Sequence, residues 1–317
     1  MRAVHYVDGK VLVQDAPEPS SDGVRVHVTA VGICGTDLHM FKMGFPIPVI
    51  PGHEIGGVLD DGTPVSIEPL LPCGKCPQCK TGDYNMCVRI PDIILGLGAD
   101  GGMTEQVMVP ERCLVYLPAN VAAKDACLIE PMAVALQGLR KAGLNGDMRV
   151  AVIGAGVIGL CAVAAVSESG AQVSLSARHP HQVKAGEKLG ATPMEGTYDL
   201  VVECAGSDSA LKQAIKLCRP NGRLLLLSNY WDGVDFPLTA AAMKGITIHT
   251  AMMYAISSVG RDFDLAAALL SRNPQIAKIL ITHRMPLEDA ARGYEIAADR
   301  KAGAIKVVLE PAAKGTK

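Results

Sequence analysis

Residues 149–166 read "RVAVIGAGVIGLCAVAAV", an apolar strand pattern, a glycine-rich turn and an apolar helix pattern in direct succession. The turn has the form G-x-G-x-x-G, with glycines at 154, 156 and 159. That motif indicates a dinucleotide site when it follows a strand and opens a helix, as it does here. Two other interpretations are a glycine-bearing helix start without a ligand, and a membrane span over residues 150–166. The span is disfavoured because a transmembrane helix needs about 20 apolar residues.

Each glycine of the turn has an expected physical task. Gly154 permits the tight turn, Gly156 lets the backbone approach a pyrophosphate, and Gly159 lets helix and strand pack closely. The helix that Val157 and Ile158 open supplies N–H groups and positive potential to the same phosphates. We therefore expect the cofactor site to include residues 154, 156, 157, 158 and 159.

Outward from this turn, apolar strand patterns alternate with helical ones. Further strands are expected at "QVSLSA", "DLVVECA", "RLLLLS" and "ITIHTA", and helices are expected to end near residues 170, 190 and 218. Continuous apolar strands that alternate with helices predict a parallel, doubly wound α/β sheet.

The end of the second strand predicts which dinucleotide binds. An NAD site usually has Asp or Glu there to hold the ribose hydroxyls. This chain reads Ser176-Ala177-Arg178-His179 instead. A small residue followed by Arg leaves room for a 2′-phosphate and supplies a guanidinium to bind it, which favours NADP(H) over NAD(H). The alternative is a basic turn in solvent.

The first 120 residues have a different texture, with many Gly and Pro residues between short apolar alternations such as "VRVHVTAVGI". This predicts a β-rich domain with many turns. The 317 residues favour two domains. A net charge of −2 implies no broad basic surface for nucleic acid. No signal-peptide core is present at the N-terminus, so we expect the cytoplasm and no membrane partner.

Residues 72–87, "PCGKCPQCKTGDYNMC", hold four cysteines at positions 73, 76, 79 and 87. Disulfides are rare in a reducing compartment, where clustered cysteines more often bind metal. A ferredoxin-type iron–sulfur site has a shorter last gap, followed by proline. Tetrahedral zinc with four thiolates suits the loop, and leaves no open position for a substrate. We therefore expect a structural zinc ion here and any catalytic zinc elsewhere.

A second potential ligand set lies upstream, where Cys34 stands in "GICGTDLHM" and His53 in "PGHEIGG". Taken with the nucleotide motif and the four cysteines, these motifs resemble the zinc-dependent medium-chain alcohol dehydrogenases. "GADGGMTEQ" and "EPMAVA" follow in that family's order, so the resemblance covers nearly the whole chain. It implies a GroES-like β-rich catalytic domain over 1–130 and 255–317, and a Rossmann domain over 131–254. It also implies homodimers or homotetramers.

The resemblance implies roles for individual residues. Cys34 and His53 look like ligands of the catalytic zinc, with Glu54 able to approach the metal. Its implied third ligand is Glu130, direct or through water, because "LIEPMAVA" resembles the sorbitol and threonine dehydrogenase branch. The resemblance also implies that Thr36 contacts the substrate oxygen and that Asp37 supports His53. His39 would form the outer end of a proton relay.

The implied reaction is hydride transfer between a small alcohol and the nicotinamide, and zinc should number about two ions per chain. Sorbitol dehydrogenases carry an Arg–Tyr pair where this chain has Met253–Tyr254, so we expect a less polar, secondary or cyclic alcohol. Six more apolar side chains could either line the substrate pocket or belong to the ordinary core: Met40, Phe41, Met43, Phe45, Ile93 and Leu95.

Several alternatives stay open at this point. One is an NAD-dependent dehydrogenase of a polyol or amino alcohol. Others are a reductase of the same superfamily, without zinc or acting on a C=C bond. The alternative of another class is a non-catalytic protein that binds NADPH and zinc.

Overall fold

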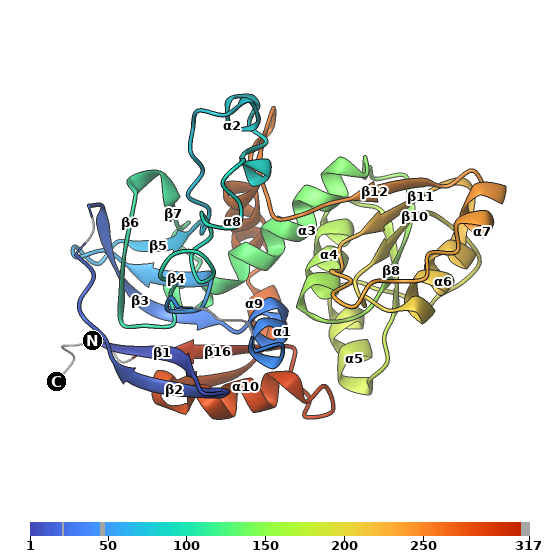
Figure 1. Cartoon of the computed structure of the whole chain (residues 1–317). Helices are drawn as coiled ribbons and strands as arrows, with labels where there is room; N and C mark the ends of the chain where they lie inside the picture. The colour runs from blue at the N-terminus through green and yellow to red at the C-terminus, as the bar shows by residue number, and fades with distance from the viewer. Residues whose placement is uncertain (21, 45–47, 312–317) are drawn as a thin grey trace. The chain divides into compact units, whose positions relative to one another are not determined.

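The computed structural model describes residues 1–20, 22–44 and 48–311. The chain forms two compact units (Figure 1). One combines Met1–Glu130 with Ala255–Lys317, and the other is Pro131–Tyr254. Each unit is described by itself below.

The unit Pro131–Tyr254 is built on a five-stranded sheet in which every neighbouring pair is parallel. The strand order is β12-β11-β10-β8-β9. The strands are β8 (Arg149–Ile153), β9 (Gln172–Ser176), β10 (Tyr198–Glu203), β11 (Cys218–Leu226) and β12 (Thr247–Thr250). The helices are α4 (Val157–Glu168), α5 (Pro180–Lys188), α6 (Asp208–Leu217) and α7 (Leu238–Met243), and most of α3 (Ile129–Lys141) also belongs to this unit. The predicted doubly wound α/β sheet is therefore confirmed.

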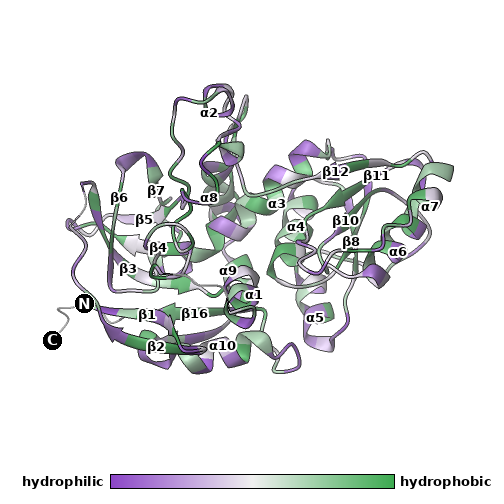
Figure 2. Ribbon diagram, in the orientation of Figure 1, coloured by the Kyte–Doolittle hydropathy of each residue, from purple (hydrophilic) through white to green (hydrophobic). Residues whose placement is uncertain are grey.

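The apolar run over residues 150–166 is divided between β8 and α4, which the glycine turn separates. Both elements are almost wholly buried, and they are largely hydrophobic in Figure 2. Burial on both faces explains why β8 and β10 lack the alternation of a strand with one wet face. No helix among the residues described above is long and apolar enough to cross a membrane.

The other unit is β-rich, as predicted for a GroES-like domain. Its main sheet runs in the order β15-β16-β3-β4-β5-β7, with β6 paired to β3. These strands are β3 (Val24–Gly32), β4 (Glu54–Val58), β5 (Pro64–Ile67), β6 (Gln106–Val109), β7 (Leu114–Tyr116), β15 (Ile281–Pro286) and β16 (Lys306–Glu310). Two smaller pairs are β1 (Arg2–Val7) with β2 (Lys10–Asp15), and β13 (Ile256–Ser257) with β14 (Gly260–Arg261).

Short helices complete this unit. The α-helices are α1 (Gly35–Lys42), α2 (Pro77–Thr81), α8 (Asp262–Arg272), α9 (Gln275–Leu280) and α10 (Ala290–Ala298). The 3₁₀ turns are η1 (Tyr84–Met86), η2 (Glu111–Cys113), η3 (Ala123–Leu128) and η4 (Leu287–Asp289).

The last strand returns to the first half of the chain. β16 pairs antiparallel with β3, with Val308 opposite Gly32 and Leu309 opposite Val31. One continuous core joins these strands to α10, because Val31, Leu309 and Tyr294 belong to the same buried hydrophobic cluster. The C-terminal strand therefore lies directly beside the segment that leads into Cys34.

Candidate functional site

Cys34 caps the N-terminus of α1 and fixes the start of that helix. Its sulfur accepts from the backbone N–H of Thr36 at 3.5 Å, and its own N–H donates to Asp37 Oδ2 at 2.8 Å. This reciprocal capping satisfies two backbone donors at the helix start. Asp37 is fully buried, whereas Thr36 and His39 are partly exposed on the same short helix. Thr36 and His39 are three residues apart, so they share one face.

His53 lies in the loop before β4 and is 7% exposed. Its Nδ1 is 3.8 Å from Asp37 Oδ1, and both atoms are buried without a closer hydrogen-bond partner. Burial alone would lower the pKa of His53, but the charges of Cys34 and Asp37 raise it well above its usual value. Burial raises the pKa of Asp37, an effect that His53 partly offsets. Cys34, Asp37 and His53 therefore interact directly.

Glu130 stands in the first turn of α3 and is 7% exposed. Burial raises the pKa of its carboxyl to about 7, while the charge of His53 lowers it. A thiolate, an imidazole and a buried carboxylate form a donor set that suits zinc. The structure does not bring the ligand atoms of Cys34, His53 and Glu130 within 4.8 Å of one another. The residues fit the metal by their chemistry and burial rather than by a preformed tetrahedron.

Glu54, the first residue of β4, has a partner that sequence reasoning missed. The Lys306 ammonium, at the start of β16, lies 2.6 Å from both carboxylate oxygens of Glu54 and donates to Ile33 O at 3.0 Å. Both side chains are 1% exposed. Burial would lower the pKa of Lys306, but the Glu54 carboxylate raises it above its usual value. The sequence does contain a signal for this pair: Lys306 stands in an otherwise apolar strand, and a charge that is buried there needs a partner of opposite charge.

Gly32 makes the room for Glu54. A Cβ at Gly32 would lie 1.8 Å from Glu54 Oε2, a contact that no real side chain tolerates. Any side chain at Gly32 would therefore have to displace the buried Glu54 carboxylate, which lies beside Lys306.

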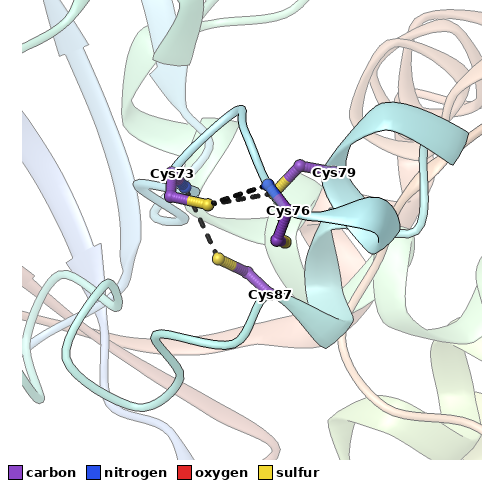
Figure 3. A group of neighbouring side chains, drawn as sticks. All are labelled: Cys73, Cys76, Cys79 and Cys87. Atoms are coloured by element: carbon purple, nitrogen blue, oxygen red, sulfur yellow. Dashed lines mark hydrogen bonds between the residues drawn. The ribbon is translucent and has the colours of Figure 1, made fainter.

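The four cysteines of residues 72–87 converge in a loop and on α2 (Figure 3). Their sulfur atoms all lie within 4.8 Å of one another, the only such group of potential ligands among residues 1–20, 22–44 and 48–311. Cys73 and Cys79 sulfurs are 3.9 Å apart, and Cys76 and Cys79 sulfurs 3.4 Å. Thiolates at the corners of a zinc tetrahedron are about 3.8 Å apart, given Zn–S bonds of about 2.3 Å. Backbone N–H groups lower the pKa of Cys73 to about 6 and also lower the pKa of Cys76, whereas burial raises the pKa of Cys79.

Charged side chains outside the cysteine pattern anchor this loop. Tyr84 donates to Glu68 at 2.5 Å, and Arg261 lies 3.2 Å from the other oxygen of the same carboxylate. Arg261 also donates to the carbonyls of Arg112 and Leu114. The four-cysteine loop is therefore held to β7 and β14, which suits a stabilising metal site.

The glycine turn at the end of β8 has the geometry that a diphosphate needs. Gly154 has φ +97°, which favours glycine, and a Cβ at Gly159 would lie 1.9 Å from Gly154 O. A Cβ at Gly156 would meet nothing within 4 Å. Open space over Gly156, at the N-terminus of α4, fits a cofactor that approaches the backbone closely. Val157 and Ile158 form the first turn of that helix.

The end of β9 carries the residues expected to select the cofactor. Arg178 is exposed, and Ala177 and His179 are partly exposed. Ser176 accepts a hydrogen bond from the Gln213 amide at 3.1 Å, a contact from α6 that sequence reasoning missed. His179 also stacks on His181, with ring centroids 5.6 Å apart. No acidic side chain takes the place that an NAD site usually fills.

Three of the six side chains weighed as pocket wall or core pack in or against the core. Ile93 and Leu95 are 1% and 3% exposed. Phe41 packs on the main core and lies 5.2 Å from the Tyr6 ring. Met40 is partly exposed, Met43 is 57% exposed, and Phe45 lies outside the described residues. Met253 has φ +58°, and Tyr254 is buried.

Two family models together match nearly all of the chain. The alcohol dehydrogenase GroES-like domain matches residues 20–119, and the glucose dehydrogenase C-terminus matches residues 123–310. With the glycine turn and the four-cysteine loop in place, the chain belongs to the zinc-dependent medium-chain alcohol dehydrogenases. It is an oxidoreductase that acts on an alcohol group with zinc and a nicotinamide cofactor.

Individual relatives agree with this assignment. L-threonine 3-dehydrogenase of Bacillus licheniformis is 31% identical over 93% of both chains. Galactitol-1-phosphate dehydrogenase from Escherichia coli has a TM-score of 0.88 and 28% identity, over 98% of this chain and 100% of that one. A protein described as a zinc-binding dehydrogenase from Sinorhizobium meliloti, bound to NADP, has a TM-score of 0.85 and 28% identity, over 98% and 99% of the two chains.

The buried Lys306–Glu54 pair leads to a stability prediction. Changing Lys306 to Met leaves the Glu54 carboxylate buried without its cation, which should lower the free energy of unfolding by about 3–5 kcal/mol. Urea denaturation of the purified variant measures this. Changing Glu54 to Gln in the same protein removes the unpaired charge and should restore part of the loss.

The matched control is Lys301→Met, an exposed lysine shortly before β16. Its effect should stay within about 0.5 kcal/mol. A double variant as unstable as the sum of its two single changes would contradict a direct interaction between Lys306 and Glu54.

Proposed function

We propose that the chain is an NADP(H)-preferring alcohol dehydrogenase whose catalytic zinc is held by Cys34, His53 and Glu130. The observation that carries this proposal is the buried group at the start of α1, where Cys34, His53 and Asp37 interact while Glu130 lies close enough to change the pKa of His53. When bound, the zinc ion acts as a Lewis acid toward the alcohol oxygen, and the nicotinamide ring takes the hydride.

Side chains around the proposed metal have distinct tasks. Asp37 orients the His53 ring through Nδ1, as carboxylates commonly do for metal-binding histidines. Glu54, paired with Lys306, stands beside the ligands without being one of the three in the resting site. Thr36 contacts the alcohol oxygen and takes up its proton. His39, on the same face of α1 and partly exposed, passes that proton to solvent.

Cys73, Cys76, Cys79 and Cys87 hold a second zinc ion with a structural task, because four thiolates close its coordination shell. None of the ten cysteines forms a disulfide bond, which suits the reducing cytoplasm that we propose as the compartment. We also propose a homodimer or homotetramer.

Metal analysis tests the two zinc sites. The native protein should contain about two zinc ions per chain. Cys34→Ser should lose one ion and all turnover while staying folded, because its site lies outside the four-cysteine loop. Cys76→Ser should lose the other ion and fold poorly, because its metal contributes folding energy.

Cys113→Ala is the control, because Cys113 is a buried thiol with no proposed metal. It should keep both ions. Fully active protein with one zinc ion or fewer would contradict the assignment.

The cofactor proposal rests on the end of β9. Ala177 removes the carboxylate that would repel a 2′-phosphate, and the exposed Arg178 can bind that phosphate through two N–H groups. The adjacent Ser176 and His179 can add hydrogen bonds. The relative from Sinorhizobium meliloti was solved with NADP, and a dehydrogenase from Escherichia coli with the same fold was solved with NADH, so the preference rests on the residues after β9.

Steady-state kinetics with both cofactors test the preference. The wild type should have a kcat/KM at least about tenfold higher with NADP(H), since charge-assisted hydrogen bonds contribute roughly 1.5–3 kcal/mol. The double change Ala177→Asp, Arg178→Ile should reverse the order. Lys184→Ile, which removes an exposed charge from α5, the helix that follows Arg178, should not. A wild type that prefers NAD(H) refutes the role of Arg178.

For the substrate we propose a rather apolar secondary or cyclic alcohol, because Met253 offers no hydrogen bond to a polyol. A second candidate is a polyol or its phosphate, which the name of the related galactitol-1-phosphate dehydrogenase favours.

A substrate panel decides between these two classes. The wild-type kcat/KM for cyclohexanol should exceed that for sorbitol. Met253→Arg should reduce the ratio of the two kcat/KM values, because arginine supplies a hydrogen-bond donor for the hydroxyl groups of sorbitol. Met252→Arg, at a neighbouring exposed position, should leave the ratio unchanged. A higher wild-type value for sorbitol than for any simple alcohol would favour the polyol class.

A further inference from the structure

Glu203 is a buried carboxylate to which the proposed function gives no task. It is the last residue of β10, is fully buried, and stands at the carboxyl edge of the parallel sheet. Ligands of such sheets bind outside that edge, where the strand order reverses. Here the reversal falls between β8 and β10. A buried carboxylate is costly unless several donors satisfy it.

The Glu203 carboxylate joins two loops. Oε1 accepts from the N–H groups of Ala205 and Gly206, at 2.7 and 2.9 Å. Oε2 accepts from the Tyr230 hydroxyl at 2.6 Å. The Glu203 carbonyl also accepts from Ser228 Oγ at 3.3 Å. The loop after β10 and the loop after β11 are thus fixed to each other through one side chain.

The same loop lies against the glycine turn. A Cβ at Gly154 would be 2.8 Å from Ala205 N, and a Cβ at Gly159 would be 3.4 Å from Cys204 Cβ. The Cys204 N–H donates to Ile153 O at 2.8 Å. Moving residues 204–206 would therefore move the surface next to the proposed diphosphate site.

The direction of the bound dinucleotide follows from the sheet order. The adenosine half would lie toward β9, because the residues proposed to select between ribose hydroxyls and 2′-phosphate follow that strand. The diphosphate would lie at the N-terminus of α4. The nicotinamide half must then extend the other way, over the ends of β10 and β11, where the Glu203–Tyr230 hydrogen bond joins the loops.

We propose that Glu203 and Tyr230 are positioning residues for the nicotinamide half of the cofactor. The inference rests on the proposed diphosphate site at residues 154–159. The Tyr230 hydroxyl holds the loop after β11 on the Glu203 carboxylate. The carboxylate in addition places a negative charge on the side of the sheet that receives the nicotinamide. That ring is positively charged when oxidised and neutral when reduced, so the charge favours the oxidised form.

Cofactor affinity of the zinc-loaded protein tests this inference. Trp231, the single tryptophan, is adjacent to Tyr230, so its fluorescence reports reduced cofactor binding at this loop. Titration calorimetry gives the Kd of the oxidised form. Tyr230→Phe should raise both Kd values about fivefold or more, the effect of losing one hydrogen bond to a charged group. Glu203→Gln should raise the Kd of the oxidised form at least about threefold more than that of the reduced form.

Tyr198→Phe is the matched control. Tyr198 begins the same strand, is buried, and its hydroxyl accepts from Glu195 N at 2.7 Å. Loss of the Tyr198 hydroxyl removes a hydrogen bond at the opposite end of β10 from Glu203. Both Kd values should therefore stay within about twofold of the wild type. Glu203→Gln and Tyr230→Phe variants that bind like Tyr198→Phe would overturn the inference.

Three further outcomes have separate meanings. Equal weakening of both cofactor forms by Glu203→Gln would also overturn it, because loop packing alone would then explain the effect. If Glu203→Gln does not fold, unchanged Kd values in Tyr230→Phe decide against the inference. Failure of the wild type to bind either dinucleotide would instead refute the proposed diphosphate site.

Discussion

The contact between Lys306 and Glu54 is the constraint on which the β-rich unit depends. Both groups are charged and almost inaccessible to solvent. Burying either charge without the other would be strongly destabilising. Their contact requires β16 and β4 to lie on either side of β3, although 252 residues separate the two side chains along the chain. The C-terminal strand is therefore fixed in register by a polar contact as well as by its apolar side chains. Gly32, on the intervening strand β3, provides the space for the carboxylate.

The same contact explains the arrangement around Cys34. Lys306 also donates to the carbonyl of Ile33, the residue before Cys34. Glu54 follows His53 directly, so fixing its carboxylate also limits where the His53 ring can lie. The start of α1 is fixed independently by the reciprocal hydrogen bonds of Cys34, Thr36 and Asp37. A proposed metal site on a loop is thereby held by buried groups on two strands and one helix, which is the support that a precise site requires.

In the parallel unit, the main constraint at the proposed cofactor site is how closely two backbone segments approach each other. The turn after β8 and the loop after β10 approach so closely that a side chain at Gly154 would clash with Ala205, and a side chain at Gly159 would clash within the turn itself, with Gly154 O. Glu203 holds the second of these loops through backbone N–H groups. The two units therefore use different means at their proposed sites: paired charges near Cys34, and hydrogen-bonded loops around the glycine turn.

Much of the fold could be predicted from local pattern. The five parallel strands, the helices between them and the β-rich N-terminal part follow from periodicities that a short window of sequence contains. The four-cysteine group was predictable for the same reason, since its ligands lie within sixteen residues. The dinucleotide motif was predictable because strand, turn and helix are contiguous.

What the sequence by itself determined is thus whatever is encoded by neighbouring residues. The tertiary structure alone decided which distant polar groups meet: Lys306 with Glu54, Gln213 with Ser176, and Tyr230 with Glu203. It also decided that Phe41, Ile93 and Leu95 pack in the interior, because an apolar side chain suits a core and a pocket wall equally well by composition. The physical reason is that a buried polar group must find a partner somewhere, but only the packed chain determines which partner is within reach.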